Sequence, residues 1–274
     1  MPCPSLPDFH MHTPRCNHAT GSVADYARAA VNKGLYEIGM SDHSPMPGGF
    51  DKAWRMDESQ LAGYIDEVER ARVEFADQLS IRVGLEADYH PGSEAYVEDM
   101  IAAHDWDYVI GSVHYIGDWG FDNPDYIKIW DDWNIDDAYV AYYDLLAASA
   151  ATGLFDIIGH PDLIKKFNHR PSPDSRAVAD AEEFMLQAVL NSGAALEISS
   201  AGLRKPVQEI YPQQRIVARA AELGIHFAFG SDAHAPGDVG HGMEECISVL
   251  EASGITEIAS FEQRQRTMVS IRHD

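Results

Sequence analysis

The sequence predicts an α/β protein that forms one barrel of parallel strands over residues 1–274. Seven short apolar runs alternate with longer amphipathic stretches, which is typical of strands joined by crossover helices. Seven such units in 274 residues fit a single barrel better than two separate domains. A side chain able to bind a metal stands at or near the end of each run, the face where barrel active sites gather.

The strands and helices follow from hydrophobic periodicity. The predicted strands cover residues 8–12, 35–40, 80–86, 108–113, 155–159, 194–198 and 225–229. The predicted helices cover residues 22–34, 57–79, 94–104, 136–152, 175–191, 212–223 and 241–253. Ser22 and Asp25 have the spacing of a helix-capping box. Residues 115–137 lack periodicity and hold three tryptophans, so we expect a long functional loop over one end of the sheet.

Charge and cysteine content restrict the class of protein. The 20 basic and 44 acidic residues give a net charge of −24, which disfavours nucleic acid as a partner. Cys3, Cys16 and Cys246 are widely spaced, so we expect a reducing compartment rather than a disulfide framework. The apolar runs are too short to span a bilayer, and the start has no signal-peptide pattern. We therefore expect a cytoplasmic protein with no membrane partner, and the oligomeric state is left open.

The positions of the histidines and acids predict a metal centre. His10 and His12 alternate on the first predicted strand, so both imidazoles point to the same side. One His-x-His pair is weak evidence, but a His, Asp or Glu at the end of all seven strands is much stronger. The nine candidate ligands are His10, His12, His18, His43, Glu86, His114, His160, Asp232 and His234.

Nine nitrogen and oxygen ligands are too many for one ion, and three per ion predict two to three divalent ions. Imidazole with carboxylate suits Zn, Fe or Mn better than Ca or Mg. We expect Glu197 to lie behind the ions and to hydrogen-bond a ligand imidazole. Cys16 stands between His12 and His18, and we expect it to act as a small buried apolar residue.

These motifs resemble those of the PHP (polymerase and histidinol phosphatase) superfamily, which begin with His-x-His and end with Asp-x-His. The resemblance extends to its histidinol-phosphate phosphatases and covers nearly the whole chain. Its most specific stretches are residues 8–18, 41–47, 84–92, 107–115, 159–167, 200–206, 209–212 and 230–234. The resemblance implies a distorted (β/α)7 TIM-like barrel with a trinuclear centre of zinc, iron or manganese.

The resemblance also implies how the ligands divide. One ion takes His10, His12, Glu86 and Asp232, and Glu86 bridges to a second ion held by His114 and His160. The third ion takes His18, His43 and His234. The implied enzyme is a phosphoric monoester hydrolase of histidine biosynthesis, which cleaves L-histidinol phosphate by in-line attack of a metal-bridging hydroxide.

A phosphate ester also requires cations and a proton source outside the metals. Arg204, Lys165 and Lys166 follow predicted strands, and we expect them, with Tyr115, to bind the substrate phosphate. The proton for the leaving alkoxide can come from Asp42, His43, His234 or a metal-bound water. The histidinol part of the substrate carries an amine and an imidazole. Candidates for contact with these two groups are acids and aromatics of the 115–137 segment, among them Asp118, Trp119 and Asp122.

Three alternatives stay open. The chain can be a phosphoesterase of the same superfamily that acts on nucleotides, nucleic-acid ends or other small phosphomonoesters. It can be a regulatory protein that binds metal without turnover. It can also be a metal-dependent amidohydrolase on a similar barrel, although no predicted strand ends in the lysine that a carboxylated-lysine site requires.

Overall fold

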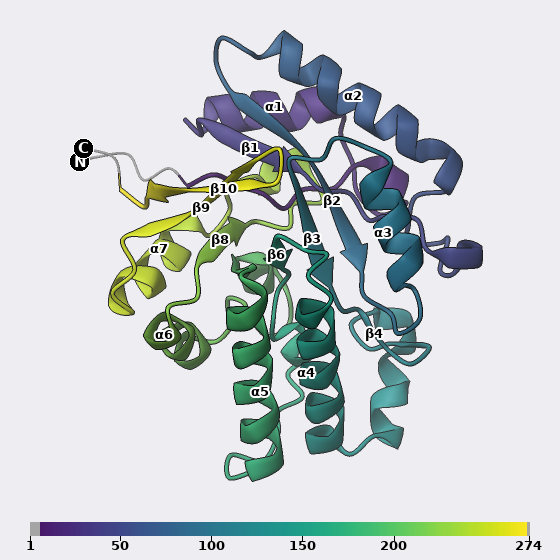
Figure 1. Cartoon of the computed structure of the whole chain (residues 1–274), viewed down its shortest axis with the longest axis vertical. Coiled ribbons are helices and arrows are strands. Elements are labelled where there is room, and N and C mark those ends of the chain that lie inside the picture. Colours follow the sequence, from purple (N-terminus) through teal and green to yellow (C-terminus); the bar gives the residue numbers. More distant parts are fainter. Residues whose placement is uncertain (1–5, 273–274) are drawn as a thin grey trace.

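The computed structural model describes residues 6–272 and has a curled parallel sheet at its centre, with helices on the outside (Figure 1). Six strands are hydrogen-bonded in the order β1-β2-β3-β6-β7-β8, and every neighbouring pair is parallel. They are β1 Glu37–Met40, β2 Ser80–Asp88, β3 Tyr108–Ser112, β6 Ile157–Ile158, β7 Ala195–Ser199 and β8 Phe227–Gly230. The predicted α/β class is confirmed.

The predicted first strand, residues 8–12, lies between the two edges of this sheet. Phe9 N donates to Phe229 O at 3.0 Å on the β8 side, and Gly39 N of β1 donates to Asp8 O at 2.8 Å on the other. The segment makes isolated bridges rather than a regular ladder. It therefore supplies an irregular seventh strand position, in line with the seven strands that the sequence predicts and with the distorted barrel that the family resemblance implies.

Seven helices surround the barrel, each where a helix is predicted, with ends that differ by a few residues. They are α1 Val23–Asn32, α2 Leu61–Glu74, α3 Glu94–Ala102, α4 Ile135–Ala151, α5 Arg176–Ser192, α6 Gln214–Leu223 and α7 Met243–Ala252. The Ser22 and Asp25 side chains form the expected capping box at the start of α1. Among residues 6–272, the helices are all too short or too polar to cross a membrane.

The segment predicted as an unstructured loop has structure of its own. It contains a short hairpin, β4 Tyr115–Ile116 and β5 Trp119–Gly120, followed by a 3-10 helix, Pro124–Asp132. The Trp119 ring lies 4.9 Å from that of Trp130 and 5.2 Å from that of Trp133, measured between centroids. The three tryptophans therefore hold the segment together, so the prediction of a structureless loop is wrong.

A second hairpin, β9 Glu257–Glu262 and β10 Gln265–Ser270, is absent from the sequence prediction. It brings Phe261 within 5.9 Å of the Phe9 ring, which also packs on Tyr108 at 5.0 Å. Tyr108 begins β3, so this aromatic cluster fills the N-terminal end of the barrel. The opposite end, where the strands finish, stays open for a site.

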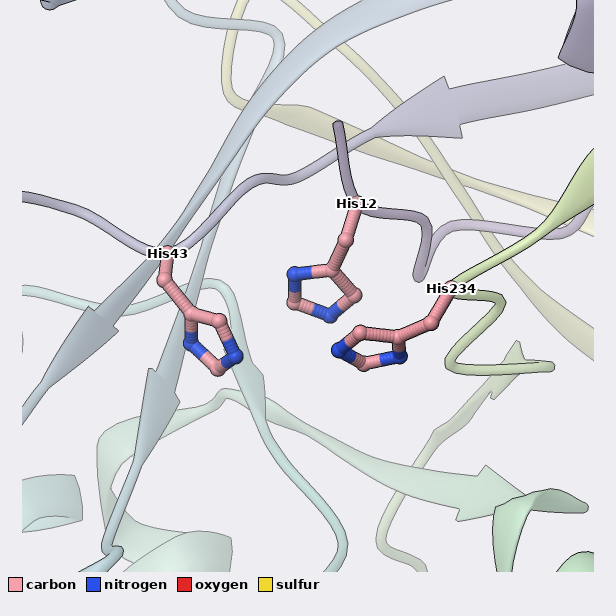
Figure 2. Close-up of side chains that lie close together, drawn as sticks. All are labelled: His12, His43 and His234. Carbon is pink, nitrogen blue, oxygen red and sulfur yellow. The ribbon is translucent and has the colours of Figure 1, made fainter. Parts of the chain in front are cut away.

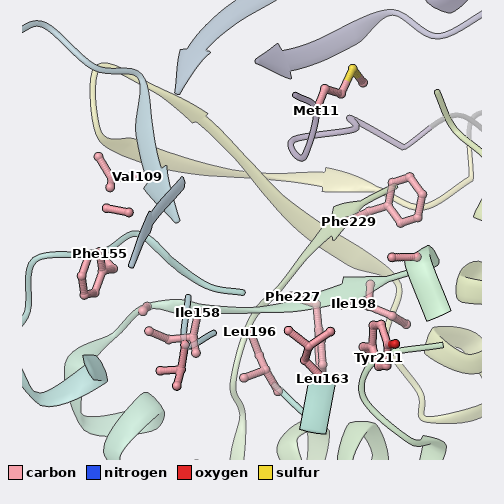
Figure 3. Packing of buried hydrophobic residues seen from close by; sticks show 14 of the residues in the cluster. Met11, Val109, Phe155, Ile158, Leu163, Leu196, Ile198, Tyr211, Phe227 and Phe229 are labelled. Atoms are coloured by element: carbon pink, nitrogen blue, oxygen red, sulfur yellow. The ribbon is translucent and has the colours of Figure 1, made fainter. Parts of the chain in front are cut away.

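Alternation along each strand separates packing from function. On β7, Leu196 and Ile198 join the main apolar cluster around the barrel, where they lie near Phe227 of β8 (Figure 3). Glu197, between them, therefore points to the opposite face, the interior of the barrel. Cys16 and Cys246 are buried free thiols, and Cys3 lies outside the described residues.

Gly84 tests the packing inside the barrel, because a Cβ at this position would overlap the buried ring of Tyr108. We expect Gly84→Ala to lower the free energy of unfolding by about 1 to 3 kcal/mol, as overpacked cores do. Urea denaturation measures the change. The control is Gly237→Ala, at an exposed glycine with open space around it, which should stay within about 0.5 kcal/mol of wild type. Equal stability of Gly84→Ala and wild type would contradict the packing described here.

Candidate metal centre

The C-terminal ends of the strands bring the nine candidate ligands together. Figure 2 shows His12, His43 and His234 projecting from three separate segments into one shared space. One ligand nitrogen of each lies within 4.8 Å of those of the other two. The His12 and His234 rings stack with centroids 4.1 Å apart, and His234 Nε2 lies 2.9 Å from His18 Nε2. Residues up to 222 positions apart in the chain thus form one cluster.

Glu86 of β2 lies at the centre of the cluster and is completely buried. Its Oε2 lies 2.7 Å from His43 Nδ1, and its Oε1 lies 3.0 Å from His160 Nε2 and 3.3 Å from His10 Nε2. Burial raises the pKa of the Glu86 carboxyl, but the imidazoles of His43, His10 and His114 outweigh it and hold the pKa well below its ordinary value. One carboxylate therefore joins ligands from several strands.

The histidines divide into two electrostatic groups. Burial lowers the pKa of His18 to about 4, helped by His12, and burial also lowers those of His43 and His234 well below the ordinary value. These three imidazoles are neutral near pH 7, the form that binds metals. For His10, burial lowers the pKa, but Glu197, Glu86 and Asp232 outweigh it and raise the pKa well above the ordinary value.

His114 belongs to the second group, because Asp88 and Glu86 overcome the effect of burial and raise its pKa to about 9. The carboxylates therefore attract protons onto His10 and His114, and a bound cation would take the place of those protons.

Buried polar atoms without hydrogen-bond partners test whether a metal fits. In the described part of the chain, several such atoms belong to the candidate ligands. They are Nε2 of His10, both ring nitrogens of His12, Oε2 of Glu86 and Nδ1 of His160. Buried polar groups normally have partners, so this concentration of unpartnered atoms is what a metal centre requires. Neutral imidazoles with carboxylates fit Zn, Fe or Mn.

Glu197 supports two of the ligands at once, and it was expected to bind one. Its Oε1 lies 2.7 Å from His10 Nδ1, and its Oε2 accepts a hydrogen bond from the backbone N–H of His160 at 2.6 Å. His160 has a φ of +24°, a backbone conformation that residues other than glycine rarely adopt. The Tyr142 hydroxyl donates to His160 O at 2.9 Å. Glu197 and Tyr142 together hold this unusual backbone.

Asp88 and Arg55 form a second support that sequence reasoning missed. Asp88 Oδ1 lies 2.6 Å from His114 Nδ1, and Asp88 Oδ2 lies 2.5 Å from Arg55 Nη1. Arg55 is buried and its Nη2 reaches the Tyr115 hydroxyl at 3.3 Å. A signal for Asp88 is present, since it alternates with Glu86 on β2 and so points to the same face. Arg55 lies in a loop with no periodicity and offers no comparable signal.

A cavity of about 450 Å³ opens beside the cluster. The candidate ligands that line it are His18, His43, His114, His160, Asp232 and His234. The lining also includes cations and acids, among them Lys166, Lys205 and Asp122. For Asp122, burial raises the pKa, but Lys166 and then His114 lower it to about 2. The cavity is thus lined both by candidate ligands and by charged side chains.

A family model described as PHP domain matches residues 8–201, more than half of the chain. The chain belongs to the PHP domain family. A PHP relative from Deinococcus radiodurans, named "Probable histidinol-phosphatase", is 47% identical over 249 residues, which cover 91% of this chain and 94% of that protein. The "Histidinol-phosphatase" of Bacillus subtilis is 31% identical over 258 residues, 86% of this chain and 96% of that protein.

Solved structures share the PHP fold. A candidate histidinol phosphatase from Listeria monocytogenes superposes with a TM-score of 0.80 at 27% identity, covering 87% of this chain and 99% of that one. The histidinol phosphate phosphatase of Lactococcus lactis, solved with zinc, L-histidinol and phosphate, has a TM-score of 0.81 at 20% identity and covers 96% and 98%. At that identity the likeness concerns the fold alone. The family resemblance predicted from the motifs is confirmed.

Within this PHP barrel, the predicted substrate residues separate into two groups. Tyr115 and Lys166 line the cavity, and Lys166 Nζ lies 3.0 Å from Asp122 Oδ2. Lys165 is completely buried and its Nζ bonds to Asp162 at 2.8 Å and to Ile210 O at 2.8 Å. Lys165 therefore does not reach the cavity, and the prediction that it binds substrate is corrected.

Asp42 does not lie where a proton donor to the substrate would have to lie. It is fully buried, where it accepts hydrogen bonds from the Thr13 hydroxyl and from the His43 backbone N–H, and it is not part of the cavity wall. Its Oδ1 lies 3.5 Å from His12 Nδ1. Asp42 thus lies behind a candidate ligand rather than beside the substrate, so its assignment as a proton donor is corrected.

Arg204, Asp118 and Trp119 were expected to contact the substrate, but none of them lines the cavity. Arg204 Nη2 donates to the carbonyls of Ser231 at 2.7 Å and Asp232 at 3.0 Å, whereas its Nη1 is buried without a partner. It is outside the cavity wall, although Lys205 beside it is inside. Asp118 is exposed and Trp119 is buried, and neither lines the cavity.

The double contact of Glu197 leads to a test. Glu197→Gln keeps the size of the side chain but replaces one acceptor oxygen by an NH2 donor, so either His10 Nδ1 or the His160 N–H loses its acceptor. We expect a loss of about 10- to 100-fold in metal affinity, measured by equilibrium dialysis with zinc.

The matched control is Glu182→Gln, which changes a buried glutamate of α5 that contacts Arg215 and Tyr143 outside the barrel. It should keep the wild-type affinity. Equal zinc affinity in Glu197→Gln and wild type would show that Glu197 does not hold the ligands.

Proposed function

We propose that this chain is a metal-dependent phosphomonoesterase that hydrolyses L-histidinol phosphate to L-histidinol and phosphate, a step of histidine biosynthesis. The observation that carries the proposal is a cluster of imidazoles and carboxylates that opens into a cavity lined also by Lys166 and Lys205. Metal ions together with ammonium groups suit a phosphate dianion. The names of the relatives from Deinococcus radiodurans and Bacillus subtilis support the substrate.

The proposed cofactors are two to three ions of zinc, iron or manganese. The ligand sets are His10, His12, Glu86 and Asp232 for the first ion, Glu86, His114 and His160 for the second, and His18, His43 and His234 for the third. The unpartnered buried atoms of His10, His12, Glu86 and His160 support these sets. When bound, the ions would lower the pKa of a water so that hydroxide is available near pH 7 to attack phosphorus. They would also supply positive charge for the phosphoryl oxygens.

The chain's own groups orient and neutralise the substrate. Lys166 and Tyr115 of the cavity wall are proposed to hold the phosphoryl group, together with the unpartnered Nη1 of Arg204. The proton for the leaving alkoxide is proposed to come from a water held beside His43 or His234, because the low pKa values of both imidazoles keep them neutral near pH 7. The substrate is a small molecule rather than nucleic acid, in line with the net charge of −24. We propose one catalytic domain over residues 1–274 that works in the cytoplasm, where its buried thiols stay reduced.

Phosphate release from a panel of monoesters tests the proposed function. With two to three equivalents of metal bound, kcat/KM for L-histidinol phosphate should exceed that for p-nitrophenyl phosphate by at least about 100-fold. Exhaustive chelation should abolish turnover, and restored metal should recover it. Faster cleavage of nucleotides would favour a nucleotide phosphoesterase. No release from any monoester by the metal-loaded protein would favour a binding protein.

Arg204→Ala tests the phosphate clamp. If the unpartnered Nη1 meets a phosphoryl oxygen, its loss should lower kcat/KM by about 100-fold or more, with metal content at the wild-type value. Arg204→Lys should recover only part of the loss, because an ammonium lacks the guanidinium fork.

The control is Arg176→Ala, which removes an exposed arginine of α5 and should leave kcat/KM within a factor of about two. Loss of metal together with activity in Arg204→Ala would instead mean that Arg204 supports Asp232 through its carbonyl.

A further inference from the structure

An ion pair lines the same cavity as six of the candidate metal ligands. Asp122 follows β5, Lys166 follows β6, and the carboxylate Oδ2 lies 3.0 Å from the ammonium nitrogen. Both side chains line the cavity and keep some exposure, 18% for Asp122 and 15% for Lys166. His114 and His160 line the same cavity and help to lower the pKa of the Asp122 carboxyl, so the pair belongs to the surroundings of the candidate metal centre.

A carboxylate in this position is unfavourable for a simple phosphate ester. The phosphate dianion has to approach Lys166, and the negative charge of Asp122 beside that lysine opposes the approach. When the phosphate takes Lys166 as its partner, Asp122 is left as a partly buried carboxylate without a cation, which is costly. The cost disappears if the substrate brings a positive group to Asp122.

We propose that Asp122 binds the ammonium group of a phosphomonoester that carries a primary amine on the carbon next to the ester CH2. The phosphate then replaces Asp122 as the partner of Lys166, and the ammonium replaces Lys166 as the partner of Asp122. Lys166 and Asp122 each keep an oppositely charged partner during this exchange. This inference rests on the proposed function, since L-histidinol phosphate carries its amine at that carbon. Asp122 is then the residue that selects aminated substrates.

The other acids of the cavity wall are already engaged in a different way. Asp232 is a candidate metal ligand, with Oδ1 3.0 Å from His12 Nε2. Asp51 accepts the hydroxyl hydrogen of Tyr115, whose oxygen also meets Arg55. A carboxylate already held by a tyrosine beside an arginine attracts an ammonium less strongly than one whose partner leaves with the incoming phosphate.

The experiment compares esters that differ only in the amine. One pair is L-histidinol phosphate and its analogue with hydrogen in place of the amino group, and the other is phosphoethanolamine and ethyl phosphate. The measured quantity is the ratio of kcat/KM for the aminated ester to that for the amine-free ester, with metal content determined in parallel. In Asp122→Asn we expect this ratio to fall by at least about 30-fold, because the amide keeps the size of the side chain and removes its charge.

Two further variants serve as matched controls. Asp118→Asn changes an exposed acid on the same segment that does not line the cavity, and the ratio should stay at the wild-type value. Asp51→Asn changes the cavity acid that is not a candidate metal ligand, and the ratio should fall much less than in Asp122→Asn. A collapse of the ratio in Asp51→Asn but not in Asp122→Asn would overturn the proposal.

Two other results would also overturn it. An equal loss on both members of each pair in Asp122→Asn would mean that Asp122 only positions Lys166. If the wild-type protein shows no preference for either aminated ester, the cavity has no site that selects an ammonium group. This measurement needs no variant. The second pair separates the two proposals. A preference for phosphoethanolamine that depends on Asp122, without rapid cleavage of L-histidinol phosphate, would retain the ammonium site and reject the proposed function.

Discussion

The arrangement of the site depends on one buried carboxylate, that of Glu86, and on the positive charge that it requires. A carboxylate without solvent is stable only when it is paired. Imidazoles from several strand ends surround it, and further acids lie behind two of them, Glu197 behind His10 and Asp88 behind His114. Along these two lines, where the carboxylates raise the pKa of the imidazole, charge alternates in sign outward from Glu86, and the outer acid fixes the orientation of the ring.

The two ends of the barrel have opposite roles because of this charge. At the N-terminal end, Phe9, Tyr108 and Phe261 fill the interior with aromatic rings, and the hairpin β9–β10 covers them. At the C-terminal end, polar groups that need partners make dense apolar packing impossible, so a cavity remains. Asp8 shows how the two are linked, since its carboxylate accepts hydrogen bonds from the backbone of Ser231 and Gly240 and so holds the chain around the candidate ligands Asp232 and His234.

Most of the fold is predictable because it follows from patterns within short windows. Apolar runs, helical periodicity and a ligand type at each strand end locate the barrel and its active face. The C-terminal hairpin is different, because β10 is largely exposed and has no apolar alternation, and its pairing with β9 is decided by packing against Phe9 and Tyr108.

The side chains outside the ligand cluster are harder to predict, for a related reason. Lys165 and Lys166 are neighbours in a short 3-10 turn, and only the fold decides that Lys165 turns inward to Asp162 whereas Lys166 faces the cavity. Arg55 reaches Asp88 across 33 positions of sequence, and the buried Asp42 accepts a hydrogen bond from Thr13, 29 positions away. Hydrophobic periodicity and residue spacing describe a single helix or strand, whereas these contacts join different helices, strands or loops.

The balance of charge also bears on which phosphate esters can enter. A chain with a net charge of −24 repels anions at long range, and the repulsion grows with the charge of the ligand. Lys166 and Lys205 reverse the field only locally, because ions screen charges over about 10 Å at 0.1 M ionic strength. A nucleotide with several phosphates meets a stronger repulsion on approach than a monoester does. A monoester with its own ammonium carries less net negative charge, and the acids that repel other anions then contribute to its binding. The acidity of the chain and the presence of Asp122 beside the proposed phosphate site thus favour the same kind of substrate.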